Sequence, residues 1–158
     1  MTFVVALALS AAIAPPCTAA RLAGTFAVVP GSPGAGNIVY ALRLKNTSSA
    51  ACTLTGIPDV TLLDRRGRKL PTHPFPAQPG ALTAVLVTLA PGKSAKATAR
   101  FSPDVPGPGE PVSGRRCEPV AYTLLVRPGG GGTVRAPIRP PTSVCEHGGM
   151  TWSVLTKG

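Results

Sequence analysis

Short runs in which apolar and polar residues alternate recur along most of the chain, separated by clusters of Gly, Pro, Asn and Ser. In the clearest run, residues 38–45, one face carries Ile38, Tyr40, Leu42 and Leu44, and the other carries mostly small or basic residues. A period of two is typical of a β-strand with one buried face. We therefore predict a strand here.

The same alternation predicts further strands and hairpins. Residues 59–64 are expected to turn at Arg65–Gly67 and return through 68–70, while 83–89 and 94–101 flank a Pro91-Gly92 turn. Residues 120–126 and 133–138 flank Gly129–Gly132, and residues 151–155 form the last strand, where Trp152 would close one end. The most buried side chains should be Tyr40, Leu42, Leu44, Leu62, Ala97, Phe101, Tyr122 and Leu124.

Seven to nine short strands and no convincing helix follow from these runs. A single sheet would leave one apolar face in water, so we predict an all-β fold, an immunoglobulin-like antiparallel β-sandwich. The 158 residues of the chain fit a single domain. Two long connections, 71–80 and 103–114, are rich in proline and should be extended at the surface.

The first twenty residues carry no charge, and Phe3–Ile13 form a run of 11 largely apolar residues. This length suits a signal peptide and is too short for a membrane span, which needs about 20 residues. We assign residues 1–16 to a signal peptide and 17–158 to the domain, although no Lys or Arg precedes the run and Pro15 follows the best cleavage site. The alternative is a first buried strand. The protein would be secreted or associated with the cell envelope, and Pro15-Pro16 before Cys17 argue against a lipid anchor.

Four cysteines in an exported chain predict two disulfides, for which three connectivities exist. We expect the sequential pairs, Cys17 with Cys52 and Cys117 with Cys145. These would close loops of about 35 and about 28 residues, each contributing roughly 3–4 kcal/mol.

The formal net charge is +10, and the densest basic cluster is Arg65, Arg66, Arg68 and Lys69, on a predicted hairpin tip. Arg115 and Arg116 form a second. Such charge attracts an anionic cell-wall polymer or membrane surface, unless it serves solubility alone. Nucleic acid is disfavoured as a partner, because the leader indicates export and no aromatic residue lies within the basic clusters.

Catalytic signatures are missing from the sequence. His73 lies in the proline-rich connection, His147 beside Cys145, and neither belongs to a hydrolase motif such as G-x-S-x-G. Cys145-Glu146-His147 has no partner pair at metal-ligand spacing, so no metal or cofactor is expected. We expect a binding protein rather than an enzyme. An alternative is a protein-interaction or inhibitor module in which the connection 71–80, with His73 and Phe75, inserts into a partner.

One stretch carries a family resemblance. The pattern N-T-S-x-x-x-C-x-L-x-G-x-P runs from Asn46 to Pro58, after a leader that ends near Cys17 and before the late Cys117 and Cys145. This combination resembles an exported, largely actinobacterial family described as domain of unknown function 4232. The resemblance implies export or surface attachment and a β-sandwich with two disulfides. It implies no reaction.

Overall fold

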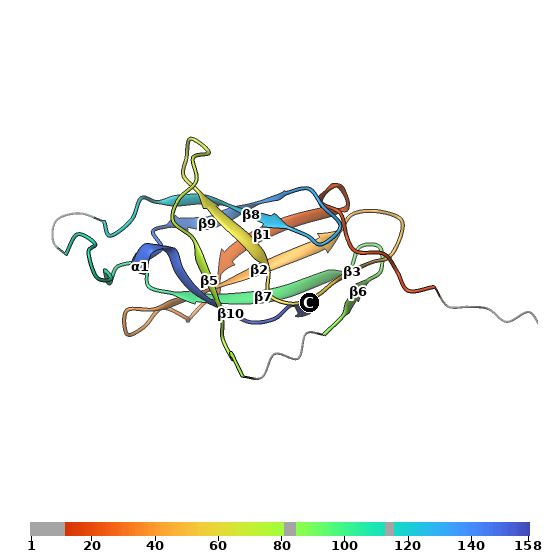
Figure 1. Ribbon diagram of the computed structural model, residues 1–158, viewed down its shortest axis with the longest axis horizontal. Helices are drawn as coiled ribbons and strands as arrows, with labels where there is room; N and C mark the ends of the chain where they lie inside the picture. Colours follow the sequence, from red (N-terminus) through yellow and green to blue (C-terminus); the bar gives the residue numbers. More distant parts are fainter. Residues whose placement is uncertain (1–11, 81–84, 113–115) are drawn as a thin grey trace, which may run out of the picture.

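The computed structural model describes residues 12–80, 85–112 and 116–158, and strands make up almost all of their regular secondary structure (Figure 1). Helical structure within these ranges is confined to the 3-10 turn η1 (Ala19–Arg21) and the short α1 (Cys145–Gly148). No helix in this part of the chain is long and apolar enough to cross a membrane. The described strands are β1 (Leu22–Val28), β2 (Ile38–Asn46), β3 (Cys52–Leu54), β4 (Asp59–Leu63), β5 (His73–Pro76), β6 (Val87–Leu89), β7 (Ser94–Phe101), β8 (Ala121–Arg127), β9 (Val134–Thr142), β10 (Gly149–Trp152) and β11 (Thr156–Lys157).

Nine of the eleven described strands share one sheet, in the order β4-β8-β9-β1-β2-β7-β10-β5 with β11 beside β7, and β3 pairs with β6. The large sheet is mixed, because β1 is parallel to β9 and β10 is parallel to β5. It curls around one core into a nearly barrel-shaped wall (Figure 1). The all-β class is confirmed. The immunoglobulin-like sandwich of purely antiparallel sheets is not, since alternation along a strand fixes its buried face but neither its neighbour nor its direction.

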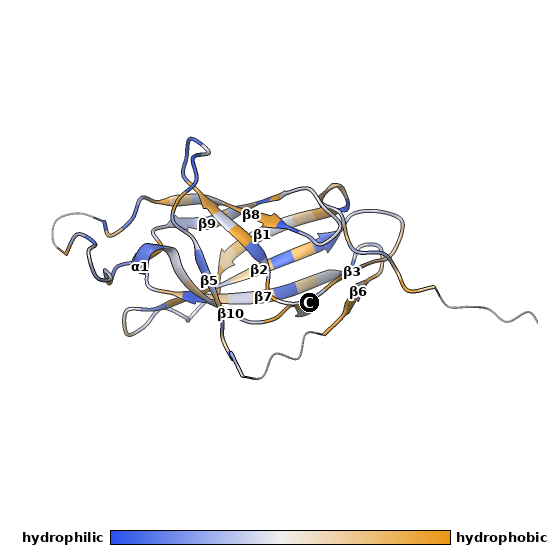
Figure 2. Cartoon of the chain, in the orientation of Figure 1, coloured by the Kyte–Doolittle hydropathy of each residue, from blue (hydrophilic) through white to orange (hydrophobic). Residues whose placement is uncertain are grey.

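Inward-facing side chains of the curled sheet form the core, and Figure 2 shows the alternation of apolar and polar residues along strands such as β2. At its centre Phe26 lies 5.1 Å from Tyr40 and 5.5 Å from Trp152, measured between ring centroids. The residues that were expected to be buried and are buried are Tyr40, Leu42, Leu44, Leu62, Ala97, Phe101 and Leu124.

Tyr122 is the exception among the predicted core residues, because its side chain is 37% exposed. The pairing of β8 with β9 shifts register between Ala121 and Thr123. The shift reverses the alternation, so that Ala121 and Leu124 both face the core. A period of two assumes an uninterrupted ladder, and such an irregularity breaks it.

Two of the predicted hairpins form, and one does not. Asp64 and Arg68 close the turn after β4, and β8 and β9 pair antiparallel across the glycine run. The Pro91-Gly92 turn instead joins the two sheets, because β6 pairs with β3 whereas β7 pairs with β2. The Gly92 N–H donates to the backbone oxygen of Asn46, which ties this turn to the end of β2.

The disulfides are Cys17–Cys52 and Cys117–Cys145, the sequential pairs expected from the sequence. They indicate an oxidising compartment. Residues 15–17 lie beside Thr53 of β3, whose N–H donates to the Pro15 oxygen at 2.9 Å, and the Cys17 N–H donates back to the Thr53 oxygen at 2.9 Å. Residues 1–11, which hold most of the predicted signal peptide, lie outside the described residues.

Candidate functional site

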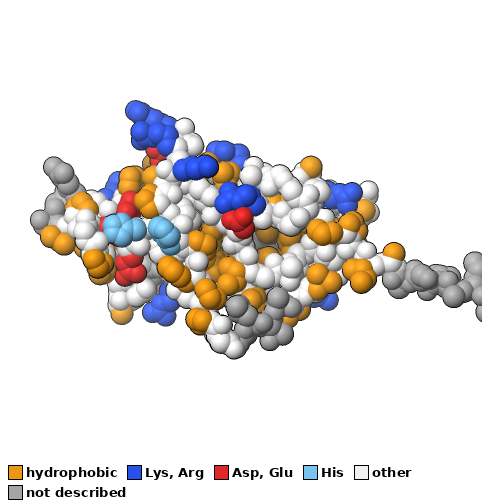
Figure 3. All heavy atoms as spheres, in the orientation of Figure 1, with side chains coloured by type: hydrophobic (Ala, Val, Ile, Leu, Met, Phe, Trp, Pro, Cys, Tyr) orange, Lys and Arg blue, Asp and Glu red, His pale blue; other side chains and the backbone are white. Residues whose placement is uncertain are grey.

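The basic tip, which we define as Arg65, Arg66, Arg68 and Lys69, projects from the body between β4 and β5 (Figures 1 and 3). Asp64 builds the turn: its Oδ1 accepts the backbone N–H of Arg66 at 2.8 Å and that of Arg68 at 2.9 Å. Gly67 completes the turn with φ of +78°, a value that suits glycine. The N–H of Arg68, its guanidinium and the N–H of Arg66 together lower the pKa of Asp64, although partial burial opposes them.

The cations of the tip differ in how they are used. Arg68 bonds Asp64, with Nε 2.7 Å from Oδ2, so the only carboxylate in the turn is already occupied. Arg65, Arg66 and Lys69 are exposed, and within the described ranges none of them forms an ion pair. The tip therefore presents three cations without an acidic partner among the described residues, on a turn that Asp64 holds through its bonds to Arg66 and Arg68.

The second predicted basic cluster does not join the tip. Arg116 is exposed beside Cys117. The segment between β7 and β8 that contains it extends to the left end of Figure 1, whereas the tip rises from the top. Arg115 lies outside the described residues. The described part of the second cluster therefore lies apart from the tip.

A cationic face that the sequence analysis did not single out lies on the outer side of β2 and β7. We define it as Arg43, Lys45, Lys96 and Arg100. The register places Arg43 directly opposite Lys96, an arrangement of like charges that destabilises a sheet unless an anion offsets it. Neither strand contains an acidic residue. The basic residues already stood at the outward positions of the two alternating runs, but only the pairing of β2 with β7 brings the two sets together.

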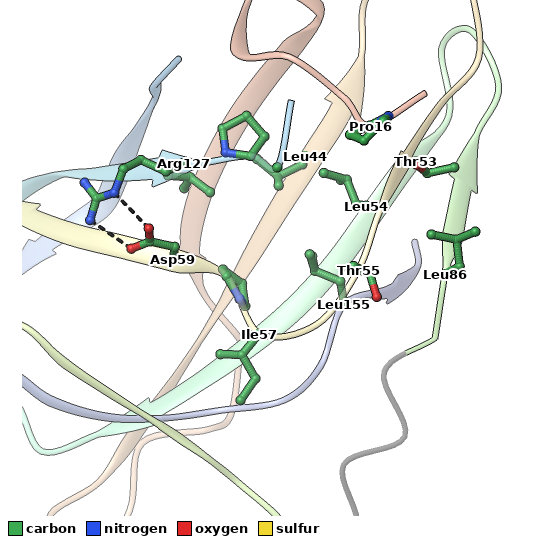
Figure 4. A pocket seen from close by; sticks show the side chains of 14 residues that line it. Pro16, Leu44, Thr53, Leu54, Thr55, Ile57, Asp59, Leu86, Arg127 and Leu155 are labelled. Atoms are coloured by element: carbon green, nitrogen blue, oxygen red, sulfur yellow. Dashed lines mark hydrogen bonds and ion pairs between the residues drawn. The ribbon is translucent and has the colours of Figure 1, made fainter. Parts of the chain in front are cut away.

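A hollow of about 460 Å³ opens between β3, β4 and β8, with Leu44, Leu54 and Leu155 in its apolar lining (Figure 4). Its two ionisable lining residues bind each other: Arg127 Nε and Nη2 lie 2.9 and 2.8 Å from the carboxylate oxygens of Asp59. The described lining contains no His, Cys or Ser. The hollow thus offers a largely apolar surface with one ion pair in its lining.

The proline-rich connection 71–80, which was predicted to be extended at the surface, contains the largely exposed strand β5, parallel to β10. Phe75 is 55% exposed and stands between two prolines, as the interaction hypothesis requires. His73 is not free for a partner in the same way, because its Nδ1 lies 2.7 Å from the backbone oxygen of His147.

Ionisable side chains from three segments converge beside the Cys117–Cys145 disulfide: Glu110, Glu118 and His147. His147 Nδ1 lies 3.8 Å from Glu110 Oε1 and 3.5 Å from Glu118 Oε1. Burial raises the pKa of Glu118, and the neighbouring Glu110 carboxylate raises it further. The hydrogen bond with the Pro108 oxygen and the two carboxylates raise the pKa of His147, although desolvation opposes them.

The residues of the motif that carried the family resemblance, Asn46 to Pro58, stabilise the fold. Asn46 is fully buried, and its Nδ2 donates to the oxygens of Ala50 at 2.8 Å and Leu89 at 3.0 Å. Cys52 bonds Cys17, and Gly56 adopts φ of +77°. These residues join β2, β3 and the N-terminal segment, so the motif holds this part of the fold together.

Fold and surface together define a small, disulfide-bonded β-domain with a strongly cationic exterior. The chain belongs to the family described as Domain of unknown function (DUF4232), whose sequence model matches residues 17–154. No curated protein and no solved structure matches the chain.

Proposed function

We propose that this domain is a non-enzymatic module of an exported protein that binds an anionic polymer of the cell envelope through its basic tip. The observation that carries the proposal is that Asp64 pairs with only one of the four cations in the tip. This carboxylate neutralises Arg68 and holds the turn, which leaves Arg65, Arg66 and Lys69 exposed without an acidic partner in the described chain. Because a polyanion releases its condensed counterions when such cations bind it, the affinity should depend strongly on salt.

The test compares two variants that lose equal charge. Binding of inorganic polyphosphate is measured by calorimetry over a series of salt concentrations for the full chain, for the tip variant (Arg65→Gln, Arg66→Gln, Lys69→Gln) and for a face variant (Arg43→Gln, Lys45→Gln, Arg100→Gln). The tip variant should bind more weakly, and its slope of log affinity against log salt should fall by about 2, at about 0.7 per lost contact. Its melting temperature should stay that of the parent, because no ion pair is lost.

The face variant is the matched control. Equal weakening in both variants would mean that net charge alone attracts the polymer, and an unchanged tip variant would remove the proposal's support. A parallel titration with phosphatidylglycerol vesicles separates the sources of anionic charge. Tip-dependent binding to vesicles without binding to polyphosphate would assign the tip to a membrane surface instead.

A second candidate function rests on Phe75, whose half-exposed ring is held between Pro74 and Pro76 on an edge strand. Prolines lack the N–H that would pair with another strand, so this edge suits an aromatic anchor better than strand addition. In this case Phe75→Ala would abolish capture of a partner protein, and moderate salt would affect that capture little.

A further inference from the structure

Glu110 gives the cluster beside the second disulfide a fixed negative charge. Its side chain is 1% exposed, and its carboxylate accepts the backbone N–H groups of Gly107 at 2.6 Å, Glu146 at 2.9 Å and His147 at 2.6 Å. Burial opposes ionisation, but the three N–H groups outweigh it and lower the pKa of Glu110. These three hydrogen bonds fix the Glu110 carboxylate in place beside His147.

His147 is oriented by a contact outside the cluster. Its Nε2 lies 2.8 Å from the backbone oxygen of Pro108. A carbonyl oxygen can only accept, so Nε2 carries the hydrogen and Nδ1 directs its lone pair towards the carboxylates. A neutral ring would thus place its Nδ1 lone pair opposite two carboxyl groups, an arrangement that a cation bound between them would stabilise.

We propose that Glu110, Glu118 and His147 bind a divalent transition-metal ion such as Zn²⁺, through one carboxylate oxygen of each glutamate and Nδ1 of His147. One candidate ligand atom from each residue lies within 4.8 Å of the others. An imidazole nitrogen with carboxylate oxygens is a donor set that zinc accepts. A ring N–H bonded to a backbone carbonyl is also the outer contact that metal-bound histidines usually make. The His147 side chain is 52% exposed, which leaves a route for the ion and for water as a further ligand.

This site is independent of the basic tip, because none of its ligands belongs to the tip. The sequence predicted no metal, because Cys145-Glu146-His147 has no partner pair at short ligand spacing. The ligands instead come from three segments that the Cys117–Cys145 disulfide and the Glu110 hydrogen bonds hold together.

The test is zinc titration of the metal-free full chain by calorimetry near neutral pH, in the absence of any polyanion. We expect one Zn²⁺ per chain and at least about tenfold weaker binding in Glu118→Gln and in His147→Gln. Glu146→Gln is the matched control for Glu118→Gln, because it also removes one carboxylate charge. Glu146 lies next to His147 in the α1 turn but is not a proposed ligand. His73→Gln controls for the neighbouring imidazole, and both controls should bind like the parent.

A readout specific to coordination accompanies the titration. The ¹⁵N resonance of His147 Nδ1 should shift on addition of zinc in the parent, and circular dichroism should show that the variants remain folded. The proposal is overturned if the parent shows no saturable zinc binding, in which case a proton alone balances the cluster. It also fails if His73→Gln abolishes binding while Glu118→Gln does not.

Discussion

Asp64 and Arg68 are joined twice: Asp64 Oδ1 accepts the backbone N–H of Arg68 at 2.9 Å, and Oδ2 lies 2.7 Å from its guanidinium Nε. Asp64 therefore shapes the tip and neutralises one of its four cations, Arg68. The tip is consequently a fixed turn with three available cations. Binding a polyanion at this tip should therefore cost the protein less conformational entropy than binding at a flexible basic loop would.

The turn should loosen in acid. Because hydrogen bonds lower the pKa of Asp64 in the folded chain, its contribution is complete above the unfolded value, 3.8, and is lost as the pH falls through the lower folded value. We expect the amide resonances of Arg66 and Arg68 to shift over that acid range in NMR titrations. Asp64→Asn keeps an oxygen that can accept both bonds but does not titrate. Equal acid shifts in that variant would contradict the assignment.

Each disulfide should contribute substantially to stability. Cys17→Ala with Cys52→Ala opens a separation of 35 residues, and Cys117→Ala with Cys145→Ala one of 28. Loop entropy in the unfolded chain predicts a loss of roughly 3–4 kcal/mol in the free energy of unfolding for each pair. Urea denaturation followed by circular dichroism measures this loss. A loss below about 1 kcal/mol would indicate that the unfolded chain is already restricted.

Trp152, the single tryptophan, should tolerate phenylalanine much better than alanine. Trp152→Ala would empty a site in contact with Phe26 and should lower the free energy of unfolding by about 3–5 kcal/mol. Trp152→Phe retains the aromatic contact and removes an Nε1–H that has no hydrogen-bond partner among the described residues. Urea unfolding compares the two variants, and equal losses would show that the indole fills space that a phenyl ring cannot.

Two glycines with similar backbone angles should respond differently to alanine. Gly67 and Gly148 have φ of +78° and +79°, so a side chain is strained at either position. A Cβ at Gly67 meets nothing within 4 Å, whereas one at Gly148 would collide with the backbone of Pro71. Gly67→Ala should cost roughly 1–2 kcal/mol and Gly148→Ala clearly more, as measured by urea unfolding. Similar losses would mean that the α1 turn can move away from Pro71.

The sequence alone predicted the all-β class and most of the buried faces, because both depend on the local alternation of apolar and polar residues. It left three disulfide connectivities open, and the structure shows that the expected sequential pairs form. The prediction for Tyr122 failed where it assumed regular pairing, since the shift between β8 and β9 is a property of both strands. The Pro91-Gly92 hairpin failed for a related reason. A turn dipeptide fixes the local bend, but the two strands it joins find partners elsewhere, in β3 and β2.

The location of the basic tip was also predictable, because a turn and its charges are adjacent in the chain. Tertiary structure decided which of those charges are available, since Asp64 occupies Arg68. It also created the opposition of Arg43 and Lys96, and the convergence of Glu110, Glu118 and His147. Neither arrangement is visible in the sequence, because strand register and loop packing bring together residues from separate segments of the chain, and no local pattern records such proximity.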